Sequence, residues 1–298
     1  MQPFYKLFLT LLIVFTTVDK AQAQWQPFEL VNGKVVIDIH LNGIPAKAII
    51  DSGQNFHAIS TDFSERYPEN LKVERNKGYF VDISGPVKTP VFTSVKAKLF
   101  GADLELQYIP KVNINDADFI LGLSFFKGLI LQIDYPNKRL QMVPRSAIDL
   151  KSVANIEMRP EQNSTLPAIK VQVNGESTWV VLDTGYEKGL FLKRNFVIDN
   201  NLVESDVEKV EINSLTDSFY VEQFSINTLN IANYELENIL SQIPLENQAA
   251  HIYQKRSRFN PDKLKRGVKT SGKLGYDVLK HFILTIDFKH YNAHLWAG

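Results

Sequence analysis

Two short motifs in this sequence have side chains suited to acid–base chemistry, Asp51-Ser52-Gly53 and Asp183-Thr184-Gly185. Two carboxylates held close together do not ionise together easily, so they share one proton. The ionised carboxylate then takes a proton from water, while the protonated one donates a hydrogen bond to a carbonyl oxygen. That division of roles is suited to hydrolysing an amide bond. Because such a pair titrates as a unit, the sequence assigns acid or base to neither aspartate.

The segment before Asp51 predicts a β-hairpin. Apolar residues alternate with mostly polar ones over residues 35–41, and Asn42-Gly43 is a strong turn dipeptide. A second apolar stretch over residues 46–50 then leads into Asp51. The aspartate is therefore expected at the end of the second hairpin strand.

The same pattern precedes Asp183. Apolar residues alternate over residues 169–173, Asn174-Gly175 forms the turn, and residues 179–182 lead into the aspartate. In both halves the aspartate follows the turn glycine by eight residues. A single such motif is a weak signal, but two in equivalent positions indicate an internal repeat.

The repeat continues after each aspartate. Ile120-Leu121-Gly122 and Lys273-Leu274-Gly275 each precede a short predicted helix. Each helix is followed by an apolar strand that ends in aspartate and an aromatic residue, at residues 129–135 and 282–288. The chain is therefore interpreted as a tandem duplication.

The duplication defines the expected domains. Residues 24–144 form the first lobe, residues 145–167 the linker and the approach to the next strand, and residues 168–298 the second lobe. The second lobe contains a basic insertion near residues 245–271. This insertion could be an exosite or a mobile loop over the cleft. The alternative, a solvated surface loop, is favoured because loops tolerate insertions at little cost.

This combination of motifs resembles the pepsin and retropepsin superfamily of aspartic peptidases, and the resemblance spans nearly the whole chain after residue 23. It implies an all-β fold of two homologous β-barrel lobes with the active site in the cleft between them. It also implies that Asp51 and Asp183 are the catalytic residues of an aspartic endopeptidase. Peptides or unfolded proteins would be the substrates, and neither a metal nor an organic cofactor is expected.

The resemblance also implies roles for the neighbouring residues. The hydroxyls of Ser52 and Thr184 would lock the two loops together by hydrogen bonds. Gly53 and Gly185 would let backbone amides approach the carboxylates, because glycine has no Cβ. The alternative is that all four residues only form turns.

The downstream glycines, Gly122 and Gly275, would pack beside the two loops. Some residues depart from the family pattern: Lys273 replaces an apolar residue, and Tyr186 and Glu187 stand where small hydroxyl residues are common. These departures favour an alternative function, a catalytically inactive peptide-binding protein of the same fold. A third interpretation, a structural module of the cell envelope, leaves the paired aspartates unexplained.

Members of the superfamily cover the cleft with a β-hairpin flap. The candidate in the first lobe is Gly78–Pro90, with Tyr79 as a cleft aromatic and Gly85 near the tip. The matching hairpin of the second lobe is expected near residues 215–220. Either segment is alternatively an ordinary exposed hairpin.

Composition excludes several other functions. The chain has 33 basic and 33 acidic residues, so it lacks the positive excess typical of nucleic-acid binding. It contains no cysteine, which rules out disulfides and a thiol nucleophile. No zinc-peptidase, serine-hydrolase or phosphate-loop motif is present. His57 follows the first motif closely, and a structural role is favoured for it.

The first 23 residues have the features of a cleavable signal peptide. Lys6 precedes a mostly apolar run over residues 7–18, and Ala21-Gln22-Ala23 matches the cleavage pattern. The run is short for a permanent anchor, which is the alternative. The protein is thus expected to be secreted or periplasmic, without a stable membrane anchor, and monomeric because one chain supplies both aspartates.

Overall fold

The computed structural model describes most of the chain, namely residues 24–82, 85–203, 207–213, 215, 218–246, 248 and 267–298. The predicted signal peptide, most of the predicted basic insertion and Ser84 at the predicted flap tip lie outside these residues. No helix in the described segments combines the length and apolar character needed to cross a bilayer.

The first half of the chain folds around a ten-stranded sheet. Its members are β2 (Glu29–Val31), β3 (Lys34–Leu41), β4 (Ile44–Asp51), β5 (Ala58–Ser60), β6 (Lys72–Asp82), β7 (Gly85–Thr93), β8 (Val95–Leu99), β9 (Ala102–Leu106), β10 (Ile109–Val112) and β11 (Phe119–Gly122). The predicted hairpin is β3–β4, in which Leu41 pairs with Ile44 across the two-residue turn. Asn42 and Gly43 both have positive φ, as the tight turn between two twisted strands requires.

The second half folds around an eight-stranded sheet. Its members are β14 (Met158–Pro160), β15 (Pro167–Val173), β16 (Glu176–Leu182), β17 (Leu190–Leu192), β18 (Glu208–Asn213), β19 (Ser218–Ile231), β20 (Tyr234–Pro244) and β21 (Gly272–Leu274). The hairpin β15–β16 repeats β3–β4, including the positive-φ turn at Asn174 and Gly175. Both predicted hairpins are therefore confirmed.

A third, five-stranded sheet joins the halves. It contains β1 (Gln26–Pro27), β12 (Ile130–Asp134), β13 (Arg139–Val143), β22 (Ile283–Asp287) and β23 (Asn292–Trp296). Strands β12 and β22 pair antiparallel, so equivalent strands of the two repeats lie side by side. One hydrophobic cluster extends through both halves and across this joint.

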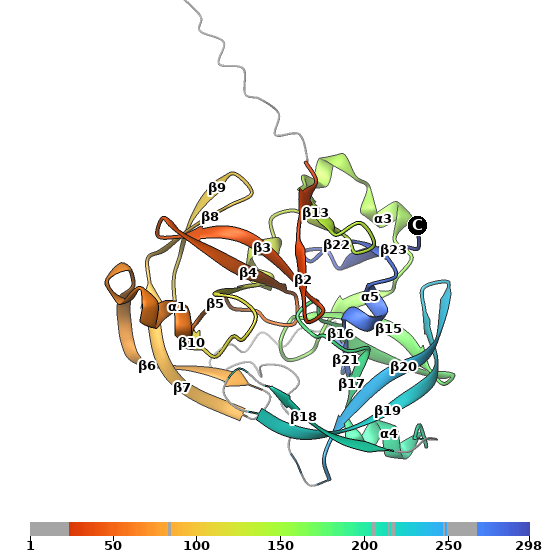
Figure 1. Ribbon diagram of the computed structural model, residues 1–298. Helices are drawn as coiled ribbons and strands as arrows, with labels where there is room; N and C mark the ends of the chain where they lie inside the picture. Colours follow the sequence, from red (N-terminus) through yellow and green to blue (C-terminus); the bar gives the residue numbers. More distant parts are fainter. Residues whose placement is uncertain are drawn as a thin grey trace, which may run out of the picture.

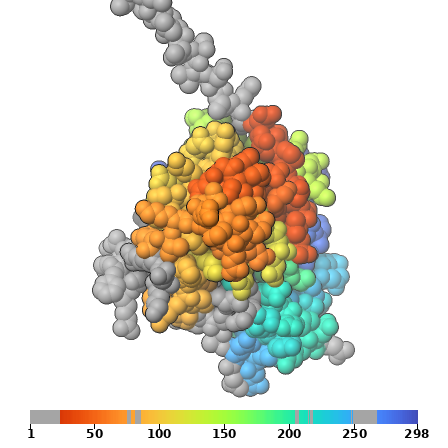
Figure 2. Space-filling model, turned by 60° about the vertical axis from the view of Figure 1, so that its left-hand side comes forward, coloured from red at the N-terminus to blue at the C-terminus, as the bar shows by residue number. Residues whose placement is uncertain are grey.

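The helices are α1 (Thr61–Arg66), α2 (Leu123–Phe126), α3 (Leu150–Val153), α4 (Arg194–Asp199) and α5 (Tyr276–Leu279), with 3₁₀ turns at Pro68–Asn70 and Arg145–Ala147. The helices are short, and α1 and α4 lie at the periphery of the molecule (Figure 1). Helices α2 and α5 are the two predicted after the Gly122 and Gly275 motifs. Figure 2 shows red-to-yellow residues of the first half above cyan and blue residues of the second half on one face. The fold is thus all-β and two-lobed, as predicted.

Candidate active site

The two aspartates occupy equivalent places at the ends of equivalent strands. Asp51 is the last residue of β4, and Asp183 directly follows β16. Beside each loop runs a parallel strand from later in the same half, β11 next to β4 and β21 next to β16. Side chains at the carboxyl end of both β4 and β16 therefore face the junction of the lobes.

The glycines show how closely the two loops approach each other. A Cβ built on Gly53 would lie 2.3 Å from Cγ of Asp183, and one on Gly185 would lie 2.6 Å from Cγ of Asp51. Each glycine is thus packed directly against the carboxylate of the other lobe. Only a residue without a side chain fits at this distance. The structure therefore brings Asp51 and Asp183 together.

Reciprocal hydrogen bonds connect the loops. The amide of Ser52 donates to Oγ1 of Thr184, and the amide of Thr184 donates to Oγ of Ser52, both at 3.0 Å. The hydroxyls then donate across the interface, Ser52 to the carbonyl of Leu182 at 2.7 Å and Thr184 to the carbonyl of Ile50 at 2.8 Å. All four bonds lie in the protein interior, where an unpaired polar group is costly. They fix the separation of the two loops.

Backbone amides contact one oxygen of each carboxylate. Gly53 donates to Oδ1 of Asp51 at 2.8 Å, and Gly185 donates to Oδ1 of Asp183 at 2.9 Å. Both carboxyl groups are buried, with Asp51 9% and Asp183 5% exposed. Burial, followed by the nearby charge of Asp183, raises the pKa of Asp51 to about 8. The pair therefore retains a proton at neutral pH.

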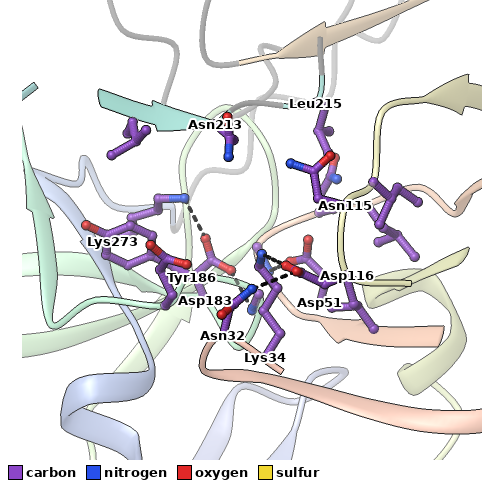
Figure 3. A pocket seen from close by; sticks show the side chains of 18 of the residues that line it. Asn32, Lys34, Asp51, Asn115, Asp116, Asp183, Tyr186, Asn213, Leu215 and Lys273 are labelled. Carbon is purple, nitrogen blue, oxygen red and sulfur yellow. Dashed lines mark hydrogen bonds and ion pairs between the residues drawn. The ribbon is translucent and has the colours of Figure 1, made fainter. Parts of the chain in front are cut away.

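Lys273 adds a positive charge on one side of the pair (Figure 3). Its Nζ lies 2.9 Å from Oδ2 of Asp183 and 4.5 Å from the ring centroid of Tyr186. The side chain comes from β21, where Lys273 pairs with Val181 of β16. The structure thus places the residue that departs from the family pattern in direct contact with one aspartate.

Tyr186 is buried beneath this lysine. Its hydroxyl donates to Oε1 of Gln242 at 2.9 Å and also lies 3.2 Å from the carbonyl of Leu190. Burial is the largest cause that raises its pKa. Glu187 lines the same cleft and lies 3.6 Å from Nζ of Lys188. Tyr186 and Glu187 therefore both lie at the site. The sequence alone did not decide whether they face it.

The first lobe carries apolar and neutral groups at the corresponding positions. Ile120 pairs with Ile49 of β4, as Lys273 pairs with Val181 in the second lobe. His57 accepts a hydrogen bond from the amide of Gly122 at 3.1 Å through Nδ1, and its Nε2 lies 2.9 Å from Oγ of Ser124. Burial lowers the pKa of His57 to about 4, so the ring is neutral near pH 7. Its contacts are those of a structural residue.

The downstream glycines pack against the backbone of the active-site loops. A Cβ on Gly122 would lie 2.1 Å from the carbonyl oxygen of Phe56, and one on Gly275 would lie 2.2 Å from that of Tyr186. These contacts hold α2 and α5 beside the loops. Gly122 and Gly275 therefore lie directly beside the two loops.

The aspartates open into a cleft of about 370 Å³ between the lobes. Its other lining includes Leu215, at the start of the predicted second hairpin, and residues that the sequence did not single out: Asn32, Lys34, Asn115, Asp116 and Asn213. Asn32 and Lys34 both bind the carboxylate of Asp116, at 2.7 and 2.5 Å (Figure 3). The only local signal was the turn dipeptide Asn32-Gly33, which does not reveal what the turn packs against.

The hairpin β6–β7 lies where the first flap was predicted. Along β6, Tyr79 is 58% exposed and stacks with Lys88, whereas Phe80 is buried and packs on Phe56. Tyr79 thus faces solvent, because successive residues of a strand point to opposite faces. Gly85 begins β7, and the tip just before it lies outside the described residues.

The second hairpin, β18–β19, bridges the cleft. The amide of Asn113 in the first lobe donates to the carbonyl of Leu215 at 2.8 Å. The Leu215 side chain packs against a cluster of buried first-lobe residues, Ala58, Phe80, Val112 and Ile120. Figure 1 shows β6–β7 and β18–β19 converging on the same side of the molecule. The hairpin of the second lobe therefore forms part of the wall of the cleft.

Comparisons with known proteins identify the fold. No family model matches the chain, and no curated protein matches it by sequence. Among solved structures, the chain is similar to the aspartic proteinase from Irpex lacteus, with a TM-score of 0.53 and 10% sequence identity. The match covers 93% of this chain and 97% of the proteinase. The chain therefore has the two-lobed fold of a pepsin-like aspartic proteinase.

Across the described part of the chain, no three His, Asp or Glu side chains are grouped so as to hold a metal ion. The cleft brings the paired aspartates and Lys273 together, and its described lining also includes Lys34, Asp116, Glu187 and Glu211.

Proposed function

We propose that this protein is an aspartic endopeptidase in which Asp51 and Asp183 activate one water for attack on a peptide bond. The observation that carries the proposal is the pair of reciprocal Ser52–Thr184 hydrogen bonds, which holds the two carboxylates face to face. A buried carboxyl pair of this kind retains one proton near neutral pH, which supplies both an acid and a base.

The chemistry requires no other reactant than water. The ionised aspartate takes a proton as water attacks the carbonyl carbon, and the protonated aspartate donates its proton to the carbonyl oxygen. The resulting diol collapses when the C–N bond breaks and the leaving nitrogen receives a proton. Both carboxyl groups then return to their starting states.

The cleft supports a peptide or unfolded protein as the substrate. It runs between the lobes, and its walls combine apolar side chains with several amide side chains, including Asn115, Asn213 and Gln242. Such walls suit a chain that presents both side chains and backbone polar groups. The features of residues 1–23 support action outside the cytoplasm, either secreted or in the periplasm. Since one chain carries both loops, a monomer suffices.

A peptide-binding protein without catalytic activity is the second candidate. The observation that favours it is the ion pair between Lys273 and Asp183, which gives this carboxylate a partner in the absence of substrate. In such a protein the cleft would hold a peptide but leave it intact. The two candidates make opposite predictions for the same assay.

The test is cleavage of a mixed peptide library across about pH 3 to 9 by the wild type, Asp51→Asn and Asp183→Asn. Asp103→Asn, an exposed substitution of the same chemical type on β9, is the matched control. Cleavage by the wild type and the control, lost in both dyad variants, supports the peptidase. Peptide binding without cleavage by folded wild type supports the second candidate. Activity that survives both dyad substitutions would place the active site elsewhere.

A further inference from the structure

The two aspartates have different partners at their second carboxylate oxygens. Both receive a backbone amide at Oδ1, from Gly53 and Gly185. At Oδ2, Asp183 also receives the ammonium of Lys273 at 2.9 Å. The position in the first lobe that corresponds to Lys273 is held by the apolar Ile120. The dyad is thus symmetric in its backbone but asymmetric in charge.

We propose that Lys273 sets the direction of proton transfer in the dyad, by holding Asp183 as the ionised base and leaving the shared proton on Asp51 as the acid. This inference rests on the proposed peptidase function. Lys273 acts through Asp183 and does not itself touch the reacting atoms, so it is a positioning residue.

The position of Lys273 follows from strand register. Strand β21 lies between β16 and β17, and Lys273 pairs with Val181 on one side and Phe191 on the other. Its side chain crosses the face of Tyr186, with Nζ 4.5 Å from the ring centroid. A cation over an aromatic face is attracted to it, which keeps the ammonium directed at Asp183.

Tyr186 does not supply the second donor to Asp183. It occupies the position that in the resembling family often carries a small hydroxyl residue. Its own hydroxyl is directed away from the carboxylate, toward Gln242 and Leu190. Lys273 therefore supplies the second hydrogen bond to Asp183, and it brings a positive charge with that bond.

Burial makes this charge decisive for the location of the proton. The Lys273 side chain is 19% exposed and that of Asp183 is 8% exposed. A proton on Asp183 would break the 2.9 Å ion pair and leave the buried ammonium with only the more distant charge of Asp51, which is unfavourable. A proton on Asp51 leaves the ion pair intact. The nearby charge of Asp183 and burial both favour the protonated form of Asp51.

Other ionisable groups surround the dyad and do not reverse this preference. They are Tyr135, Tyr186, Glu187, Glu211 and the Lys34–Asp116 ion pair. Burial raises the pKa of both tyrosines, so they stay neutral. Lys34 has its own carboxylate partner in Asp116. The charge in contact with Asp183 is that of Lys273.

The assignment gives each proton a defined path. Water attacks the carbonyl carbon and gives its proton to Asp183, while the proton of Asp51 passes to the carbonyl oxygen. When the C–N bond breaks, Asp183 donates its proton to the leaving nitrogen, and Asp51 takes one from the diol. Asp183 ends ionised beside Lys273 and Asp51 ends protonated, so the starting state is restored.

The test compares wild type with Lys273→Met, which removes the charge at similar length, and Lys273→Arg, which keeps it. Aspartate carboxyl carbons are labelled with ¹³C and titrated by NMR, and Asp51→Asn and Asp183→Asn assign the two signals. In wild type at pH 7 we expect an ionised Asp183 and a protonated Asp51, with the latter titrating near pH 8.

In Lys273→Met the Asp51 midpoint is expected to rise by about one pH unit, because the lysine charge lowers the pKa of Asp51. At pH 7 the two carboxyl signals should also become more alike as the proton is shared. Lys273→Arg should retain the wild-type pattern. Unchanged titration in Lys273→Met, or a protonated Asp183 in wild type, would overturn the assignment.

Peptide cleavage provides the second readout. The alkaline limit of activity, where Asp51 loses its proton, should move upward in Lys273→Met, and Lys273→Arg should keep the wild-type limit. An unshifted limit in a cleaving Lys273→Met variant would contradict the assignment. If no variant and no wild type cleaves, the peptidase proposal fails, whereas the NMR titration still decides the role of Lys273.

Discussion

The two lobes share the backbone around their aspartates but differ in the side chains beside them. Hairpins β3–β4 and β15–β16 have matching turns, and α2 and α5 follow equivalent glycines. Next to Asp51 the lining residue is Ile120, and next to Asp183 it is Lys273. The repeated backbone determines where the carboxylates lie. We propose that the unlike side chains determine which carboxylate holds the proton.

The largest expected effect comes from removing either carboxylate. Asp51→Asn and Asp183→Asn should each lower kcat/KM for a cleaved peptide by about a thousandfold or more, since each removes an acid–base group. Because each lobe supplies one of the two carboxyl groups, neither aspartate is expected to be dispensable. A variant that keeps more than about a tenth of the activity would show that the lobes do not contribute equally.

The next largest effect is expected at the glycines that separate the carboxylates. Gly53→Ala would place a methyl group 2.3 Å from Cγ of Asp183, which forces the two loops apart. A displacement of this kind is expected to lower kcat/KM about a hundredfold. Gly128→Ala, whose Cβ would meet no atom within 4 Å, is the control. Equal activity of the two variants would contradict the close approach of the loops.

A smaller effect is expected from the hydroxyls that join the lobes. Thr184→Ala leaves the buried amide of Ser52 and the carbonyl of Ile50 without their partner. The free energy of unfolding should fall by about 1–3 kcal/mol for each unsatisfied group. Urea denaturation measures the change, and Thr184→Ser, which keeps the hydroxyl, is the matched variant. Equal losses in both variants would mean that the methyl group matters and the hydrogen bonds do not.

The smallest expected effect is a dependence of stability on pH that arises in the first lobe and has no counterpart in the second. Folding lowers the pKa of His57 from 6.5 to about 4, so the unfolded chain binds a proton in that interval and the folded chain does not. The folded state is most stable above this interval, and roughly 3 kcal/mol of the free energy of unfolding is lost as the pH falls through it.

The second lobe has no histidine at the corresponding position, where the carbonyl of Gly189 accepts from the amide of Gly275 at 3.0 Å. Substitution of His57→Gln should therefore flatten the dependence of unfolding free energy on pH between about 4 and 6.5. Denaturation curves at several pH values test this. If the slope is the same in wild type and variant, the acid sensitivity has another source.

Much of the fold was predictable because its information is local. Alternating apolar residues and an Asn-Gly turn predict each central hairpin, and each hairpin positions an aspartate at its end. Two copies of this unit with the same downstream helix and strand indicated two similar β lobes. The positions of Ser52, Gly53, Thr184 and Gly185 followed from the same repeat.

The side-chain environment of the cleft was decided by contacts between distant segments. Lys273 lies 90 positions after Asp183 in the sequence, and only the register of β21 against β16 directs its ammonium to that carboxylate. Leu215 reaches the first lobe through the packing of a hairpin, and Tyr79 faces solvent through the pleat of β6. Periodicity encodes which residues form a strand and which share a face. The partner that each face meets depends on how the lobes pack, and this is why the sequence predicted two equivalent aspartates while the tertiary structure made them unequal.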